Sequence, residues 1–187
     1  AMTAARYSCV AVVVALAGCG DLDYYAHLAR GQARILWHQR PVEEVVTDPA
    51  TDPSIRERLL LIDEVRRFAT DHVGLDGTSS SYTVYYDTGG EPIAWNVSAS
   101  PPDRFEAYRW DFPVVGALPY KGFFNRERAV AERDRLIAAG YDAVARSVAA
   151  YSLLGYLADP VLSTMIDDPE ERFVDLVLHE LTHATIY

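Results

Sequence analysis

Apolar residues recur every three or four positions in four stretches of the chain, and this periodicity predicts four amphipathic helices. The first covers residues 23–37. The second covers residues 54–72, where Asp52 is the expected N-cap and Pro53 occupies the first helical position. We expect the charged side chains of this second helix to form a solvated outer face; they are Arg56, Glu57, Arg58, Asp63 and Arg67.

The third predicted helix runs from its N-cap, Asn125, to Ala139, and Gly140 ends it. The fourth follows Asp168 as N-cap, has Pro169 in its first turn, and continues into the last residues of the sequence. Apolar side chains are so frequent in this fourth helix that we expect it to be buried; they are Phe173, Val174, Leu176, Val177, Leu178 and Leu181.

Between these helices, β-branched and aromatic residues are bounded by turn residues, which is typical of strands. Residues 81–86 and 93–99 flank a turn sequence at 87–90 and predict a β-hairpin or meander. Residues 112–118 predict a short edge strand, and residues 143–151 a further strand. Together the elements predict an α+β fold in which a small mixed or antiparallel sheet packs on helices.

The first nineteen residues have a different composition, because Arg6 is their single charge and an apolar run ends in Leu16-Ala17-Gly18-Cys19. The run is shorter than the roughly 20 apolar residues that a membrane-spanning helix needs. We interpret residues 1–19 as a lipoprotein signal peptide, since this ending resembles a bacterial lipobox with Cys19 as the lipidated residue. The alternative is a plain cleaved signal peptide. The lipobox predicts an exported, lipid-anchored protein of the bacterial cell envelope that faces the periplasm.

The chain has 17 basic and 27 acidic residues, and its net charge is -10. Such an acidic balance disfavours nucleic acid and anionic lipid surfaces as direct partners. Cys9 lies inside the apolar run, so removal of the signal peptide would leave Cys19 as the remaining cysteine and no disulfide. An exported protein without disulfides depends on packing for its stability, and a bound metal could add to it.

The fourth helix contains His179-Glu180-Leu181-Thr182-His183, which is the H-E-x-x-H pattern of zinc metallopeptidases. A spacing of four residues places both imidazoles on one helix face, where they can bind the same zinc ion. Glu180 is then the expected general base toward a zinc-activated water. The alternative is two surface histidines on an ordinary helix, which explains poorly why these polar residues interrupt an apolar run.

A catalytic zinc site normally has three protein ligands, so the pattern leaves one ligand unassigned. Asp175 lies one turn before His179 and could orient its imidazole, but a surface acid is the stronger interpretation. Tyr187 lies one turn beyond His183 and could border the site, but a packing aromatic is again the stronger interpretation.

Beyond this pattern, the sequence from residue 19 onward resembles the Putative aminopeptidase family of bacterial lipoproteins, zinc-dependent enzymes of the gluzincin type. One departure is Asp111, which stands where the family pattern has a cysteine. The similar segments are Tyr24-Tyr25 with Gly31-Gln32, Pro41-Val42-Glu43-Glu44, Arg66-Arg67-Phe68-Ala69, Trp95-Asn96-Val97, Trp110-Asp111-Phe112-Pro113-Val114-Val115-Gly116, Ala150-Tyr151-Ser152-Leu153-Leu154-Gly155-Tyr156 with Asp159-Pro160, and residues 179–187.

This resemblance implies that residues 20–187 form the N-terminal part of a zincin-like metallopeptidase domain that ends in the H-E-x-x-H helix. It also implies a third zinc ligand, a glutamate on a following helix, and nothing in this sequence matches that segment. We therefore expect the chain to be a fragment that lacks the third ligand. Zinc peptidases commonly bind an extended substrate along an edge strand before this helix, so we expect Tyr151 and Ser152 to line the substrate cleft, with edge-strand packing as the alternative.

The sequence thus predicts a zinc-dependent peptidase, an aminopeptidase, with His179 and His183 as metal ligands, Glu180 as the catalytic residue and peptides as substrates. Two other interpretations remain open. One is an envelope lipoprotein without catalysis that has a binding or scaffolding role. The other is a zinc endopeptidase, which substrates with blocked and free N-termini would distinguish.

Overall fold

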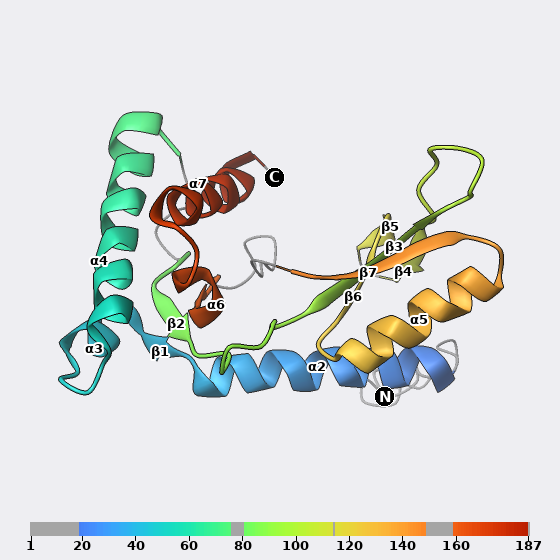
Figure 1. Ribbon diagram of the computed structural model, residues 1–187, viewed down its shortest axis with the longest axis horizontal. Helices are drawn as coiled ribbons and strands as arrows, with labels where there is room; N and C mark the ends of the chain where they lie inside the picture. Colours follow the sequence, from blue (N-terminus) through green and yellow to red (C-terminus); the bar gives the residue numbers. More distant parts are fainter. Residues whose placement is uncertain (1–18, 76–80, 114, 149–158, 187) are drawn as a thin grey trace, which may run out of the picture. The chain divides into compact units, whose positions relative to one another are not determined.

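The computed structural model describes residues 19–75, 81–113, 115–148 and 159–186 (Figure 1). Internal contacts divide the chain into two units, Ala1–Leu36 and Trp37–Tyr187. The described part of the first unit belongs to helix α2 (Cys19–His38), which confirms the helix predicted at residues 23–37. Among the described residues, no helix is both long enough and apolar enough to span a membrane.

The helix predicted at residues 54–72 is present, but its last turn has a different geometry. Helix α4 (Pro53–Phe68) begins at Pro53, and the Asp52 carboxylate accepts a hydrogen bond of 2.8 Å from the backbone N–H of Ser54. The chain then continues as a π-helix, η1 (Ala69–Val73), and ends at Gly74 with φ 76°. Glycine adopts this left-handed conformation without a steric penalty, so it terminates the wider turn.

The first sheet is mixed and brings distant segments together. Its order is β1 (Arg40–Pro41), β2 (Val84–Tyr86) and β8 (Val161–Leu162). Strand β2 pairs antiparallel with β1 and parallel with β8, where Tyr85 lies opposite Val161. The backbone N–H of Tyr82 donates to the carbonyl of Asp159 at 2.7 Å, which extends this junction toward residue 81.

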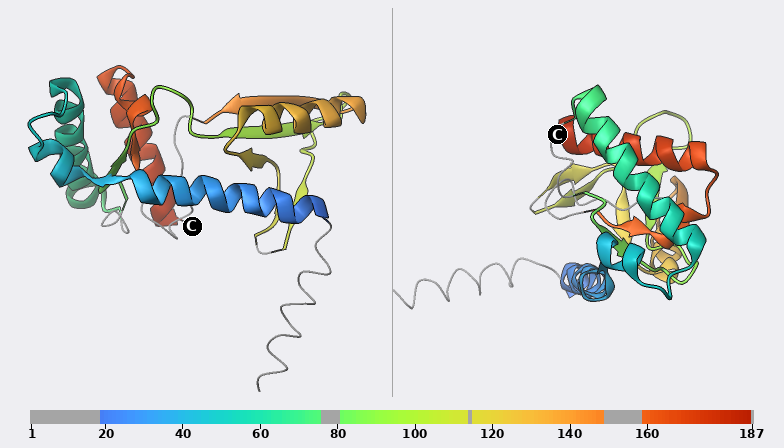
Figure 2. Two further views of the ribbon diagram at one scale, coloured as in Figure 1. Left: turned by 90° about the horizontal axis from the view of Figure 1, so that it is seen from below. Right: turned by 90° about the vertical axis from the view of Figure 1, so that its left-hand side faces the viewer.

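The second sheet is antiparallel and has the order β6 (Lys121–Phe123), β3 (Trp95–Ser100) and β7 (Asp142–Ser147). Six residue pairs connect β3 to β7, from Trp95 opposite Ser147 to Ser100 opposite Asp142. Helix α5 (Arg126–Ala138) contacts both β3 and β7 and lies along this sheet (Figure 2). Strand β7 confirms most of the strand predicted at residues 143–151, of which 149–151 lie outside the described residues.

The predicted hairpin between residues 81–86 and 93–99 is wrong, because β2 and β3 belong to different sheets. The turn between β2 and β3 is bound to Ser163 instead, because the backbone N–H of Thr88 donates a hydrogen bond of 2.9 Å to Ser163 Oγ. Strand β2 has β1 and β8 as its neighbours, so β3 is not beside it. The periodicity identified the strands, but their partners are up to 76 positions away and leave no local signal.

Residues 112–118 form two strands where one was predicted. Strand β4 (Trp110–Phe112) pairs antiparallel with β5 (Gly116–Leu118), so the chain reverses direction after Pro113. Gly116 has φ 74°, a conformation that favours glycine at this reversal.

The third predicted helix is confirmed, and both of its ends have the expected residues. Asn125 Oδ1 accepts a hydrogen bond of 2.9 Å from the backbone N–H of Arg128. Gly140 has φ 88°, and the N–H of Tyr141 donates to the carbonyl of Leu136 at 3.0 Å, as in a glycine-terminated helix.

Two short helices, α3 (Val42–Thr47) and α6 (Ser163–Ile166), were not predicted.

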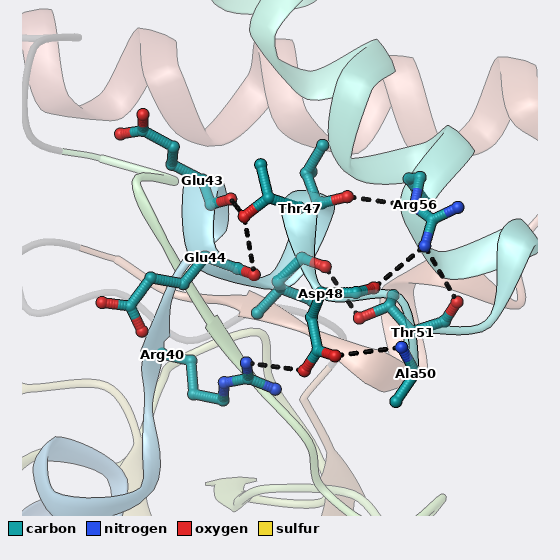
Figure 3. A network of polar contacts seen from close by, with 10 residues as sticks. Arg40, Glu43, Glu44, Thr47, Asp48, Ala50, Thr51 and Arg56 are labelled. Atoms are coloured by element: carbon teal, nitrogen blue, oxygen red, sulfur yellow. Dashed lines mark hydrogen bonds and ion pairs between the residues drawn. The ribbon is translucent and has the colours of Figure 1, made fainter.

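The turn after α3 is held by Arg56, whose guanidinium donates to the carbonyls of Val46 at 3.0 Å, Asp48 at 2.9 Å and Thr51 at 3.4 Å (Figure 3). The expectation that Arg56 belongs to a solvated outer face is therefore wrong. A guanidinium has five N–H donors, so it can satisfy several backbone carbonyls of a turn at once.

Glu132 joins α5 to two strands. Its carboxylate accepts hydrogen bonds from Arg135 at 2.9 Å and from Trp110 Nε1 at 2.8 Å, and Lys121 Nζ lies 3.8 Å away. The Arg135 hydrogen bond is the main cause that lowers the pKa of Glu132 below its ordinary value of 4.5; the Trp110 hydrogen bond and the Lys121 charge lower it further. The ionised form of Glu132 therefore stabilises the contacts of α5 with β4 and β6.

We predict that Glu132→Gln makes stability less sensitive to acid. Because the pKa of Glu132 is lower in the folded state than in the unfolded state, ionised Glu132 adds to the unfolding free energy. This contribution is complete above the unfolded-state pKa and is lost as the pH falls toward the folded-state pKa. Urea unfolding at pH 7 and about pH 3.5 should show a smaller difference in unfolding free energy for Glu132→Gln than for the unsubstituted protein. Glu127→Gln, an exposed position of the same helix, serves as the control; an equal change in both variants would contradict the prediction.

Candidate active site

The fourth predicted helix is α7 (Glu170–Ile186), which packs against α4 (Figure 1). Its side chains Phe173, Val177 and Leu181 are each 0% exposed and recur every four residues. The first described backbone bond of the helix joins the N–H of Phe173 to the carbonyl of Pro169 at 2.9 Å. This buried stripe fixes the rotation of α7 about its axis, and thereby the direction of every other side chain on it.

Arg58 of α4 holds the beginning of α7 and is not part of a solvated face. Its guanidinium donates to the carbonyl of Asp168 and to the Glu170 carboxylate, both at 3.3 Å. It also lies 5.5 Å from the ring centroid of Phe173. These three contacts connect α4 to the first turn of the helix that carries the candidate residues.

His179 and His183 lie on an exposed side of α7, and their rings approach each other. The two Nε2 atoms are 3.1 Å apart, the ring centroids are 4.7 Å apart, and the ring planes meet at 84°. This distance permits one ring to donate a hydrogen bond to the other, which requires one of the facing nitrogens to lack a proton. The predicted convergence of the two imidazoles on one helix face is therefore confirmed.

Glu180 is half-buried, between the histidine face and the buried stripe. One helical position is a rotation of about 100°, so the residue after His179 turns toward the side of Phe173 and Val177. The Glu180 carboxylate thus lies at the border between the exposed histidines and the interior of the protein.

Tyr82 lies within electrostatic reach of Glu180 and was not identified from the sequence. Its side chain is 2% exposed, and its backbone has φ 60°, an uncommon value for a bulky residue. Burial raises the pKa of the Tyr82 phenol far above its ordinary value, and the negative charges of Glu180 and Asp159 raise it further. Tyr82 is therefore a neutral phenol within electrostatic reach of the candidate base. The chain has many tyrosines, and no sequence pattern distinguishes this one from the others.

The other predicted site residues are less informative. Asp175 is exposed, and within the described residues no contact joins it to His179, so a surface acid remains the simpler interpretation. Tyr151, Ser152 and Tyr187 lie outside the described residues. Cys19 is the first residue of α2. No group of three or more histidine, cysteine, aspartate or glutamate side chains suited to a metal ion occurs among the residues that the structure describes.

A separate open hollow of about 530 Å³ lies on the second sheet, bordered by β3, the start of β7 and the segment after β3. Its lining includes Ser98, Phe105, Glu106 and Asp142, and no residue of α7 borders it. The candidate residues of α7 therefore do not lie in this hollow.

The fold and the site define an α+β protein in which one buried helix presents paired histidines and a half-buried glutamate. A family model described as Putative aminopeptidase matches residues 23–187, and the chain belongs to this family. The family description indicates peptidase activity. Comparisons with curated proteins and with solved structures found no significant match.

We predict that Arg58→Ala loosens the first turn of α7. The substitution removes two hydrogen bonds and the contact with Phe173, so the unfolding free energy should fall by about 1–3 kcal/mol. Hydrogen exchange should accelerate at the amides of the first turn of α7. Arg67→Ala, an exposed position on the same helix, is the control; equal exchange in both variants would show that Arg58 does not hold α7.

Proposed function

We propose that this protein is a zinc-dependent peptidase, specifically an aminopeptidase, in which His179 and His183 hold the metal and Glu180 acts as general base. The observation that carries this proposal is the 3.1 Å separation of the two Nε2 atoms on the exposed face of α7. Family membership over residues 23–187 supports the peptidase class. The zinc dependence and the roles of the three residues are the parts that experiment has to test.

The donor set fits zinc in both chemistry and spacing. Neutral imidazole nitrogen is a common zinc ligand, and two nitrogens that each lie about 2.0–2.1 Å from one ion in tetrahedral geometry are about 3.3 Å apart. The observed 3.1 Å is close to this separation. The two histidines supply two ligands, and the proposal leaves the third ligand unassigned.

When bound, zinc supplies Lewis-acid polarisation of the scissile carbonyl and of the attacking water. Glu180 accepts a proton from that water as it attacks the carbonyl carbon, and returns the proton to the amine that leaves. The half-buried position of Glu180 suits both steps, since its carboxylate has access to the exposed histidine face and is shielded on the other side.

The substrate is proposed to be an extended peptide that aligns with the sheet containing β7. Within the described residues, β7 pairs with β3 and is at the edge of its sheet, so its other side is a possible site for strand addition. Backbone pairing of this kind tolerates many side chains, and Tyr151 and Ser152, which follow β7 in sequence, are proposed to line the cleft. A preference for free N-termini would need a carboxylate near the substrate amine.

We further propose that the protein is exported and attached to the bacterial cell envelope by a lipid on Cys19. The sequence support is the apolar run that ends in Leu16-Ala17-Gly18-Cys19. Mass spectrometry of the membrane fraction would test this part separately, since a diacylglyceryl group on Cys19 changes the mass of the mature N-terminal peptide.

We predict that Glu180→Gln abolishes most turnover and leaves zinc binding largely unchanged. Glutamine cannot accept the proton from water, so kcat should fall by about a hundredfold to ten-thousandfold, the usual contribution of a general base. The assay compares the hydrolysis of peptides with free N-termini and of peptides with blocked N-termini. Glu171→Gln, an exposed acid in the first turn of α7, is the control. Retained hydrolysis in Glu180→Gln would refute the role of Glu180, and equal cleavage of blocked peptides would indicate an endopeptidase.

We predict that His179→Ala and His183→Ala each weaken zinc binding. Each variant removes one of the two proposed ligands, so the zinc dissociation constant should rise by about tenfold or more. Isothermal titration and metal analysis after dialysis measure this effect. His72→Ala, an exposed histidine outside the motif, should bind zinc as the unsubstituted protein does. Equal zinc affinity in all four proteins would contradict the proposed ligands.

A further inference from the structure

Helix α2 presents exposed apolar side chains along one face. Leu22 and Tyr25 are 44% and 36% exposed near its beginning. Leu36 and Trp37 are 43% and 82% exposed near its end. Ala29 and Ala33 occupy the positions between them, and steps of three or four residues keep the whole set on one side of the helix. We call residues 22, 25, 29, 33, 36 and 37 the α2 stripe.

The remaining faces of α2 have a different character. Tyr24 and Ile35 are 9% and 1% exposed, and they lie on the side opposite the α2 stripe. Polar and charged side chains occupy the face next to Trp37; they are Asp23, His27, Arg30, Arg34 and His38. An apolar face with tryptophan and tyrosine beside a face with arginine is typical of helices that lie in the plane of a membrane interface.

We infer that the α2 stripe rests in the interfacial layer of a lipid bilayer. The helix begins at Cys19, the proposed site of lipidation, so a lipid anchor on Cys19 brings the start of α2 to the membrane surface. The amphipathic pattern of α2 suits an orientation in the plane of the bilayer, with the α2 stripe toward the acyl chains. The net charge of -10 disfavours anionic headgroups, so the contact is with the apolar boundary of a zwitterionic surface.

This contact is made by the folded chain and is separate from the proposed lipid on Cys19. The inference rests on the proposed envelope location, because that location places the protein next to a membrane. Trp37 carries the largest exposed fraction of the α2 stripe, and an indole ring favours the headgroup level, where its N–H remains hydrated. Arg30 can extend its apolar stem along the same surface while its guanidinium group stays in water.

The test uses the full 187-residue chain with vesicles of phosphatidylethanolamine and phosphatidylcholine, some of which contain brominated acyl chains. Subtracting the emission spectrum of Trp37→Phe isolates the contribution of Trp37 from those of Trp95 and Trp110. On vesicles, this contribution should shift to shorter wavelength and be quenched by the brominated lipids. The double variant Leu22→Asn, Leu36→Asn should lose both effects, and Ile137→Asn, which is 51% exposed on α5, should keep them.

Circular dichroism of each variant checks that the fold is retained. If the chain binds vesicles but Trp37 is neither shifted nor quenched, the N-terminal segment alone attaches it and the inference fails. The inference also fails if the Trp37 emission already lies at the shorter wavelength without lipid and sedimentation shows self-association. In that case a second copy of the chain covers the α2 stripe. Absence of vesicle binding overturns it as well. Peptide hydrolysis on the same preparations tests the proposed function separately, because none of these substitutions lies on α7.

Discussion

Burial of one side of α7 is the constraint on which the rest of the candidate site depends. Phe173, Val177 and Leu181 are fully buried, and this fixes the helix rotation. With the rotation fixed, His179 and His183 face outward together and Glu180 lies at the border of the interior. Full burial of each of these large apolar side chains stabilises the fold by about 1.5–3 kcal/mol. A rotation of α7 that exposed all three would therefore destabilise the fold by more than any single polar contact of the site stabilises it.

The neighbouring elements reinforce that rotation. Arg58 reaches from α4 to the carbonyl of Asp168 and to the Phe173 ring, so one side chain connects the two helices through a polar and an aromatic contact. The parallel pairing of β2 with β8 brings Tyr82 to Asp159 and into the electrostatic field of Glu180. Part of the surroundings of Glu180 thus depends on a strand pairing that is remote in sequence.

The α2 stripe and the α7 site illustrate two different uses of an amphipathic helix. In α7 the apolar side is buried by the protein, and the exposed side carries the candidate chemistry. In α2 apolar side chains also occupy an exposed face, and the inferred partner is the lipid surface. A peptidase held in this way at the envelope would meet peptides near the membrane, which agrees with the proposed anchor on Cys19.

Features that depend on residues within about one helical turn of each other could be predicted from the sequence. Asp52, Asn125 and Gly140 set helix ends, helical periodicity set the four main helices, and the i, i+4 spacing set the convergence of His179 with His183. Only the folded chain establishes the partners of each strand, the separation of β2 from β3, the carbonyl contacts of Arg56 and Arg58, and the electrostatic influence of Glu180 on Tyr82. Local signals arise from backbone sterics and neighbouring side chains, whereas these pairings depend on which distant surfaces exclude water together, and no short stretch of sequence encodes that.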